Sequence, residues 1–376
     1  MPINELLAET VERFARERVR PLAEELDRNE DFPDELYKEM GKLGLFGITV
    51  PAEDGGASGT VVDYVTVMEE LAYGYASVAD QCGLIELITS LLVTFGTATQ
   101  KERYMTGLQD ASIRPAYALT EAEAGSDLAS IKTNAVQEGA DWILNGEKVF
   151  IHNAPVADVA VVLAVTDPDA RSSKRLSMFL VDIDATDGAE RAYREHKMGQ
   201  RASQVGGFVF TDARLNPDAL LGEVGAGFPA MMNVLDKGRV GIAALSLGIH
   251  RAALDAAVSY AQERKQFGQP IGNHQGIAFQ LADMATEYHA SRQLIHHAAA
   301  ALDSDEPAAA LCSMAKLFAS EAAVRNASTA VQVHGGSGYI RGVEVERLYR
   351  DARITMIYEG TSEIQRMIIS RSLLRP

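Results

Sequence analysis

The spacing of apolar residues divides the chain into three zones with different expected secondary structure. In residues 1–115, apolar side chains recur at three- and four-residue intervals, which is typical of helices that bury one face. Short runs of β-prone residues with polar turns between them occupy residues 116–225. The helical period returns in residues 226–376, and abundant alanine there suits close packing in a bundle. We therefore expect helical, β-rich and helical domains with these boundaries.

The middle zone is expected to form a small antiparallel barrel or sandwich, because several short strand candidates follow one another. Asn145-Gly146 stands between two β-prone runs, which predicts a two-residue hairpin turn. The polar segment 184–196 is expected to be a loop. Further strands are predicted at 156–165, 176–183 and 206–215.

Composition and charge narrow the class of protein. Of the 376 residues, 47% are hydrophobic and 23% are charged, as in soluble globular proteins. The net charge of −17 argues against nucleic acid as a partner, since phosphate neutralisation needs a clustered basic surface. Uncharged apolar runs such as 159–165 are too short to span a bilayer, and the acidic amphipathic N-terminus is unlike a targeting segment. We therefore expect a cytoplasmic protein with no membrane partner.

Three motif candidates do not support a function. The segment GAGFPA (225–230) has a dinucleotide-binding spacing, but no convincing strand–helix–strand pattern surrounds it. Ser337 lacks the glycine two residues later that a hydrolase nucleophile elbow requires. His289 and His296 share a helix at a spacing that does not bring both rings to one ion, and the chain has only two cysteines. We predict no metal site.

Six segments together resemble the acyl-CoA dehydrogenase family, and the resemblance covers essentially the whole chain. It implies an α-helical N-terminal domain, a β-barrel middle domain and a C-terminal four-helix bundle, the same order as the three zones. The matching segments are LTEAEAGSD (119–127), DKGR (236–239), ERKQFGQPI (263–271), QVHGGSGY (332–339), RDARI (350–354) and IYEGTSEIQR (357–366).

By this resemblance, Glu359 is the base of an FAD-dependent acyl-CoA dehydrogenase. The family reaction removes an α-proton from an acyl-CoA thioester while a hydride passes from the β-carbon to flavin N5, giving the trans-2-enoyl-CoA. Burial should raise the pKa of Glu359, and the start of the following helix should lower it. We expect a modest net rise in the free enzyme. One branch of the family carries its base at the position of Gly238, where this chain has no side chain.

The same resemblance assigns binding roles. From one subunit, FAD is expected to contact Tyr117, Leu119, Thr120, Gly125, Ser126, Phe150, Ile151, His152, Thr361, Ser362 and Glu363. From a neighbouring subunit it is expected to contact Arg264, Gln275, Gln332, Gly335 and Gly336, so a homotetramer, or at least a dimer, is implied. The residues expected to bind substrate are Ser126, Asp236, Arg239, Tyr358 and Gly360.

Two of these assignments have a simpler alternative. Asp236 and Arg239 have the spacing of an ion pair at the start of a helix. Ser362 and Gln365 have the spacing of a capping box, which is compatible with a site at Glu359.

Three positions depart from the family pattern or from expectation. Phe150-Ile151-His152 replaces the usual Trp-Ile-Thr beside the flavin, so His152 is expected to donate a hydrogen bond there in place of threonine. The change of the usual proline to Ala122 is expected to be neutral. Glu86 lies in an apolar helix; it could select a polar acyl group, but a lone acid usually faces solvent.

The expected electron acceptor is an electron-transfer flavoprotein, and the expected context is fatty acid metabolism. Two alternatives keep the fold but change the chemistry: a flavin oxidase or monooxygenase that uses oxygen, supported only by His152, and a dehydrogenase that acts on an acyl-carrier-protein thioester. A catalytically silent helical scaffold is the alternative from another class.

Overall fold

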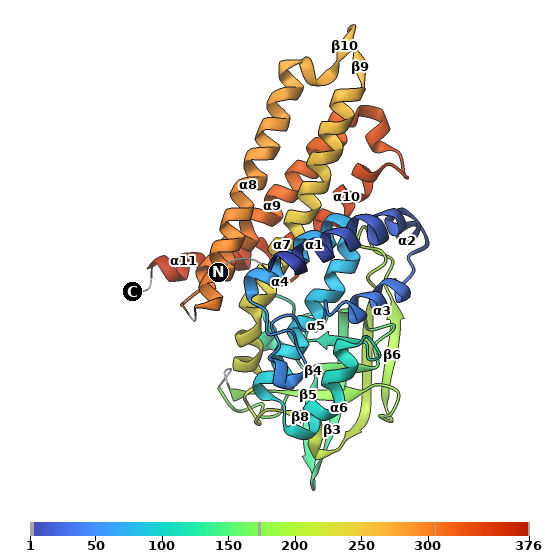
Figure 1. The fold of residues 1–376 in the computed structure, drawn as a ribbon. Helices are drawn as coiled ribbons and strands as arrows, with labels where there is room; N and C mark the ends of the chain where they lie inside the picture. Colours follow the sequence, from blue (N-terminus) through green and yellow to red (C-terminus); the bar gives the residue numbers. More distant parts are fainter. Residues whose placement is uncertain (1–3, 172–173, 305, 375–376) are drawn as a thin grey trace.

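The computed structural model describes residues 4–171, 174–304 and 306–374. A helical segment, a sheet and a second helical segment follow one another along the chain, as the apolar spacing predicts. In Figure 1 the sheet lies at one end of the molecule and the long helices of the bundle extend to the other end. Most of the N-terminal helices lie near the middle of this view, and the last of them (Ala98–Gln109) lies over the sheet.

Side-chain caps determine where two of the N-terminal helices begin. Thr60 Oγ1 accepts from the Asp63 N–H (3.0 Å), and the Asp63 carboxylate accepts from the Thr60 N–H (3.0 Å). Thr97 and Gln100 form the same reciprocal cap at the start of the helix Ala98–Gln109. Each cap satisfies two backbone N–H donors at the N-terminus of its helix. A π turn (Ala15–Val19) and a 3₁₀ turn (Arg20–Leu22) join the first two helices. The helices are α1 (Glu5–Phe14), α2 (Ala23–Asn29), α3 (Asp34–Lys42), α4 (Val61–Gly74), α5 (Ala76–Phe95) and α6 (Ala98–Gln109).

The middle segment forms one eight-stranded sheet with the order β6-β7-β3-β2-β4-β5-β8, and β1 pairs with β4 beside this path. The expected middle β domain is therefore confirmed. The expectation of purely antiparallel pairing is wrong, because β1 and β2 both run parallel to β4. The strands are β1 (Pro115–Ala118), β2 (Asn134–Glu138), β3 (Asp141–His152), β4 (Val159–Val165), β5 (Leu176–Asp182), β6 (Ala189–Arg194), β7 (Val205–Leu215) and β8 (Leu220–Leu221).

The hairpin predicted at Asn145-Gly146 is wrong, because both residues lie inside the 12-residue strand β3. The pairing of β3 with β7 shifts between Leu144 and Gly146, as it does at a β-bulge. The Asn145 side chain donates to the Asp212 carboxylate (3.0 Å) and accepts from the Asp212 N–H (2.8 Å). Asn145 therefore bridges two strands, and the chain turns instead near Gly139, whose φ is 65°.

Two further features of the sheet depend on tertiary packing. The segment 184–196 was expected to be a loop, but it contains β6, which pairs with β7. β4 is buried on both faces, which explains its continuous apolar run. Ala160, Val162 and Ala164 belong to the core of the sheet, whereas Val159, Val161, Leu163 and Val165 belong to the core shared with the helices.

Long alanine-rich helices form the C-terminal segment, as predicted. α7 and α9 pack most extensively against each other, and a short hairpin connects α7 to α8. Gly335 ends α9 with φ 59°, a conformation that favours glycine. The elements are α7 (Gly227–Glu263), β9 (Lys265–Gln266), β10 (Gln269–Pro270), α8 (Gln275–Asp303), α9 (Ala309–His334), α10 (Glu344–Arg353) and α11 (Ser362–Leu374).

α5 and α7 are the two described helices that are long and apolar enough to cross a membrane by length and composition. Most of each apolar stretch is buried inside the protein, as in the core helices of a packed domain. Their apolar character therefore has an explanation in the core itself.

Candidate active site

Glu359 lies in a tight turn between the 3₁₀ turn η9 (Ile354–Met356) and α11. Its backbone φ is 52°, and Gly360 follows with φ 90°. Left-handed backbone costs a residue other than glycine roughly 1–2 kcal/mol, so a glutamate held there indicates a constraint from its surroundings. The turn directs the Glu359 side chain toward Gly238 in α7.

The start of α11 differs from the capping box expected at Ser362 and Gln365. Thr361 precedes the first helical residue, and its Oγ1 accepts from the N–H three residues later (3.4 Å). Gln365 turns back instead: its Nε2 donates to the carbonyls of Gly360 (2.9 Å) and Glu359 (3.2 Å). Ser362 Oγ is buried and has no hydrogen-bond partner in the described part of the chain.

The Glu359 carboxylate is held in a dry environment. The residue as a whole is half-buried, but its Oε2 is shut off from solvent and has no hydrogen-bond partner among the described residues. A Cβ built on Gly238 would lie 2.9 Å from this oxygen. Burial raises the pKa of Glu359 and Asp80 adds to the rise, whereas the positive charges of Arg239 and Lys316 oppose it. The expected rise in pKa is confirmed, with burial as the main cause.

Asp236 and Arg239 form an ion pair inside α7, well past the start of that helix. The Arg239 side chain is buried, and its Nε has no hydrogen-bond partner in the described structure. This N–H donor is therefore available to another acceptor. Because the Arg239 charge also lowers the pKa of Glu359, the arginine links the expected substrate-binding position to the expected base.

A buried ion pair supports the segment that follows β1. Lys148 in β3 is fully buried, and its Nζ donates to the Leu119 carbonyl (2.9 Å) and to Glu121 Oε1 (2.9 Å). The Thr120 carbonyl accepts from the backbone of β3 (3.0 Å). Burial lowers the pKa of Lys148 to about 8. These contacts hold Leu119 and Thr120 beside β3, as a shared binding surface requires.

Other residues expected to contact the cofactor have polar groups without a hydrogen-bond partner among the described residues, or surface beside which a ligand has room. The Tyr117 hydroxyl is buried and has no partner among the described residues. Gly125 and Ser126 lie in an exposed loop, and a Cβ on Gly125 would meet only open space. Phe150 has φ 57° and is 66% exposed, whereas Ile151 is buried. The strand thus presents a large apolar ring at the surface.

His152 makes its polar contacts inside the protein. Gln81 and Asn153 exchange two amide hydrogen bonds (3.0 and 2.8 Å). Gln81 Nε2 lies 2.9 Å from His152 Nε2, and His152 Nδ1 lies 3.4 Å from Asp80 Oδ2. Burial lowers the pKa of His152 and favours the neutral ring. The ring thus has polar neighbours inside the protein, and the hydrogen bond expected from His152 to the flavin edge stays a prediction.

The five residues expected to act from a neighbouring subunit lie at the far end of the bundle (Figure 1). At about 1.5 Å per residue, α7 extends about 38 Å from Gly238 to its end at Glu263. Side chains beyond that end therefore cannot reach the Glu359 of the same chain. These residues are Arg264, Gln275, Gln332, Gly335 and Gly336, all of them exposed.

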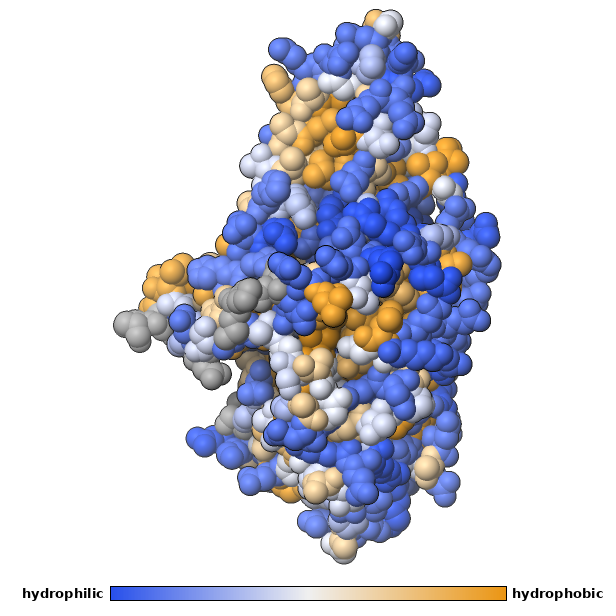
Figure 2. Space-filling view, in the orientation of Figure 1, coloured by the Kyte–Doolittle hydropathy of each residue, from blue (hydrophilic) through white to orange (hydrophobic). Residues whose placement is uncertain are grey.

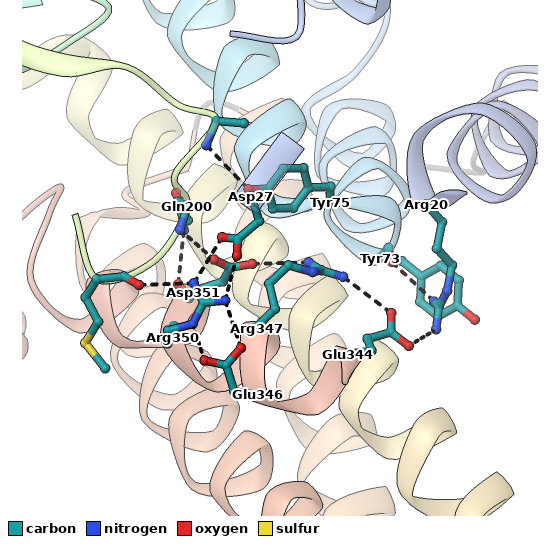
Figure 3. A network of polar contacts seen from close by, with 12 residues as sticks. Arg20, Asp27, Tyr73, Tyr75, Gln200, Glu344, Glu346, Arg347, Arg350 and Asp351 are labelled. Atoms are coloured by element: carbon teal, nitrogen blue, oxygen red, sulfur yellow. Dashed lines mark hydrogen bonds and ion pairs between the residues drawn. The ribbon is translucent and has the colours of Figure 1, made fainter. Parts of the chain in front are cut away.

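A polar network anchors α10 to the rest of the molecule (Figure 3). Arg350 donates to both carboxylate oxygens of Asp27 in α2 (3.0 and 2.6 Å). The Asp351 carboxylate accepts from the Gln200 N–H (2.5 Å), and the Asp351 carbonyl accepts from Gln200 Nε2 (3.2 Å). Gln200 Nε2 also donates to the Tyr358 hydroxyl (3.4 Å). Gln200, between β6 and β7, thus links the segment RDARI and the residue that precedes Glu359 to the sheet domain.

Glu86 was expected to face solvent, and this expectation is wrong. Glu86 is fully buried, and its Oε1 accepts from the Thr49 N–H (3.2 Å) and the Thr49 hydroxyl. Lys237 Nζ lies 3.5 Å from the same oxygen and donates to Ser90 Oγ (2.9 Å). The acid is tolerated inside because a lysine from α7 compensates its charge.

Models of three acyl-CoA dehydrogenase domains match the chain: the N-terminal domain over residues 2–112, the middle domain over 116–213 and the C-terminal domain over 225–374. The chain belongs to the acyl-CoA dehydrogenase family.

Relatives from several bacteria support this assignment over the full length. The chain is 42% identical to an acyl-CoA dehydrogenase of Bacillus subtilis over 370 residues, which cover 98% of this chain and 97% of that protein. It is 40% identical to the caffeyl-CoA reductase-Etf complex subunit CarC of Acetobacterium woodii, with 99% and 98% of the two chains covered. The solved butyryl-CoA dehydrogenase of Megasphaera elsdenii is 36% identical and superposes with a TM-score of 0.96 over the whole of both chains.

As a member of this family, the protein is an FAD-dependent oxidoreductase. Its residues fit the cofactor, since the buried Tyr117 hydroxyl and Ser362 Oγ can donate or accept a hydrogen bond and have no partner among the residues that the structure describes. Glycines with open space at Gly125, Gly335 and Gly336 allow close approach of a ligand to the backbone. Among the residues that the structure describes, no group of three or more His, Cys, Asp or Glu side chains is placed to hold a metal ion.

Sequence reasoning missed three charged residues of this acyl-CoA dehydrogenase site: Asp80, Lys148 and Lys316. Each is a charged residue on a largely buried stretch of a helix or strand, and apolar neighbours in the sequence were the available signal. Lys316 stands in the alanine-rich segment SMAKLFASEAA, where a lysine on a buried face requires a partner. That partner is the carbonyl of Gly360 (2.7 Å).

Proposed function

We propose that Glu359 removes the α-proton of an acyl-CoA thioester and that the dehydrogenation gives the trans-2-enoyl-CoA. The observation that carries this proposal is the buried, unpartnered Glu359 Oε2. An ordinary glutamate, with a pKa of about 4.3, is a weak base for a carbon acid. Burial raises its pKa, while Arg239 and Lys316 favour the anion, and a carboxylate with a raised pKa is a stronger base.

When bound, FAD supplies the acceptor for the hydride that leaves the β-carbon. The groups proposed to hold it share a surface around β1, the end of β3 and the start of α11. Phe150 offers an exposed ring for apolar contact. The proposed residues are Tyr117, Leu119, Thr120, Gly125, Ser126, Phe150, Ile151, His152, Thr361, Ser362 and Glu363.

The thioester is proposed to lie beside the left-handed turn. Gly360 leaves room for close approach, and the Glu359 N–H is the proposed donor to the thioester carbonyl, which would stabilise the negative charge of the enolate. Arg239, whose Nε is unpartnered, is proposed to bind the carrier portion of the substrate. Ser126, Asp236 and Tyr358 complete the proposed substrate contacts.

An electron-transfer flavoprotein is the proposed electron acceptor. The name of the Acetobacterium woodii relative, a subunit of a caffeyl-CoA reductase-Etf complex, supports this choice. The oxidase alternative rested only on His152, whose ring nitrogens lie 2.9 Å from Gln81 Nε2 and 3.4 Å from Asp80 Oδ2 inside the protein. We therefore favour a dehydrogenase over a direct reaction with oxygen.

We propose that each flavin site is completed by a second copy of the chain in a homotetramer or dimer. Arg264 and its neighbours are too far from Glu359 to act in the same chain, and Arg264 would neutralise the cofactor pyrophosphate. Large apolar side chains are exposed at this end, among them Phe267 (93%), Tyr339 (83%) and Phe279 (62%), and Figure 2 shows apolar surface on this part of the bundle. Arg264→Ala is expected to lose FAD without loss of the fold.

A cytoplasmic location and a role in fatty acid metabolism complete the proposal. A CoA thioester as substrate supports the metabolic role.

The decisive experiment is anaerobic titration of the yellow protein with a panel of acyl-CoAs, followed by bleaching of the flavin absorbance. Bleaching by at least one acyl-CoA is expected, and failure of every acyl thioester would refute the proposal. Glu359→Gln is expected to retain FAD and to bind the acyl-CoA, but its flavin should no longer be reduced. A near-normal reduction rate in this variant would exclude Glu359 as the base.

A further inference from the structure

We propose that Lys316 in α9 is a positioning residue that holds the turn at Glu359 and Gly360 and supplies a positive charge that keeps Glu359 ionised. This inference rests on the proposed role of Glu359 as the base. It concerns a residue that none of the motifs singled out.

The contact geometry supports a clamp on the turn. Lys316 is fully buried, and its Nζ donates to the Gly360 carbonyl (2.7 Å). Gln365 donates to the same carbonyl (2.9 Å) and to the Glu359 carbonyl (3.2 Å) from the other side of the turn, in α11. Two consecutive residues with positive φ need such external support, because the left-handed conformation is unfavourable for glutamate. Lys316 and Gln365 together satisfy the carbonyls that the turn exposes.

Charge distinguishes the two clamp residues. Gln365 is neutral, whereas Lys316 carries a positive charge that lowers the pKa of Glu359. Burial lowers the pKa of Lys316 to about 8, and Glu359 opposes this decrease, so the ammonium form predominates at neutral pH. An ammonium in a dry environment is expensive unless it is compensated, and the hydrogen bond to the Gly360 carbonyl (2.7 Å) and the charge of Glu359 compensate it.

Other charged groups act on the same pair and define the background. Arg239 from α7 favours the Glu359 anion, and Asp80 from α5 opposes it. Lys316 is also influenced by Arg239, by Glu363 at the start of α11 and by Glu321 in its own helix; the two acids raise its pKa and Arg239 lowers it. Two cations therefore face the base from two helices, and removing one should raise the pKa of the base without abolishing its ionisation.

The test compares Lys316→Met with Gln365→Met in the FAD-loaded enzyme. Both variants loosen the turn, so both are expected to reduce flavin more slowly. Only Lys316→Met removes a charge, and it is expected to move the acid limb of the kcat/KM profile to higher pH by about one unit, the usual effect of an opposite charge at close range. Lys316→Arg, which keeps the charge, is expected to retain the limb of the parent.

A second readout does not depend on turnover. The infrared band of the protonated Glu359 carboxyl, identified by its absence in Glu359→Gln, is titrated in each holoenzyme. The band is expected to persist to higher pH in Lys316→Met than in the parent or Gln365→Met. Equal titrations in Lys316→Met and the parent, or an equal shift in Gln365→Met, would overturn the role of the charge.

The outcomes separate this inference from the proposal on which it rests. Near-normal flavin reduction in Glu359→Gln would refute the base itself. Loss of reduction in Glu359→Gln together with an unmoved acid limb in Lys316→Met would refute only the inference about Lys316. FAD content and circular dichroism show whether each variant is folded, and Lys316→Arg supplies the charge test if the methionine variant is unstable.

Discussion

The carboxylate of Glu359 occupies the space that a side chain on Gly238 would need: a Cβ there would lie 2.9 Å from Glu359 Oε2. Gly238→Ala must therefore displace the carboxylate, which is the flexible end of its side chain. We expect the flavin reduction rate to fall about 10- to 100-fold, since small misplacements of a reacting group are costly. Stability should change by less than about 1 kcal/mol, because alanine favours the helix. Stopped-flow reduction and thermal unfolding measure both, and a normal rate in a folded variant would contradict the geometry.

Glu359 should also make stability depend on pH. Its pKa is raised in the folded state, mainly by burial, so the folded protein binds more protons than the unfolded chain between the ordinary and the raised pKa. Stability contributed by this group is complete below the unfolded pKa and decreases as pH rises through the folded pKa. Glutamine cannot ionise, so Glu359→Gln should be more stable than the parent at about pH 8 and similar to it at about pH 4. Melting curves across this range test the sign; a variant less stable than the parent at about pH 8 would contradict it.

His152 offers a test of its polar contacts inside the protein. Because its ring lies beside Gln81 and Asp80, His152→Ala should destabilise the protein by about 1–3 kcal/mol, the cost of leaving buried polar groups unsatisfied. The flavin midpoint potential should move by less than about 30 mV, the equivalent of about 1.4 kcal/mol for two electrons. Chemical denaturation and redox titration measure the two effects. A large change in potential with unchanged stability would instead indicate direct contact with the flavin.

The buried ion pair between Lys148 and Glu121 should contribute more to stability than the exposed ion pair between Lys132 and Glu123. Lys148→Met leaves the Glu121 carboxylate without its cation in a largely buried position, so we expect a loss of about 3 kcal/mol in the free energy of unfolding and weaker FAD retention. The matched control is Lys132→Met in the segment between β1 and β2 that also carries Glu121. Lys132 pairs with Glu123 (2.6 Å), and their side chains are 76% and 78% exposed. That change should cost less than about 1 kcal/mol. Equal losses in both variants would contradict the role of burial.

The order of domains and the position of Glu359 were predictable because their signals are local. Helical periods, strand runs and the segment around Glu359 each occupy a few dozen residues or fewer. The hairpin at Asn145-Gly146 failed because its local signal competes with a hydrogen-bonded partner, Asp212, from β7. The burial of Glu86 was not predictable, since its lysine partner is 151 positions away in the sequence.

Details of the site were also not predictable where they depend on tertiary contacts. The capping box failed because Gln365 meets the carbonyls of the turn rather than the N-terminus of its helix. The contacts of His152 with Asp80 and Gln81 were not predictable, because α5 brings these groups beside the ring and neither carries a sequence signal of that contact. Lys316 could be flagged as a charge in an alanine-rich helix, but its target is set by packing of α9 against the turn.

The length of α7 has a genetic consequence in the proposed assembly. One end of this helix serves the flavin site of its own chain, and the other end serves the site of a neighbour. A chain altered at Glu359 and a chain altered at Arg264 would each form defective homomers, yet a mixed pair would contain one site with both residues intact. Co-expression of two inactive alleles should therefore restore part of the activity, whereas two lesions at the same end of the helix should not complement each other.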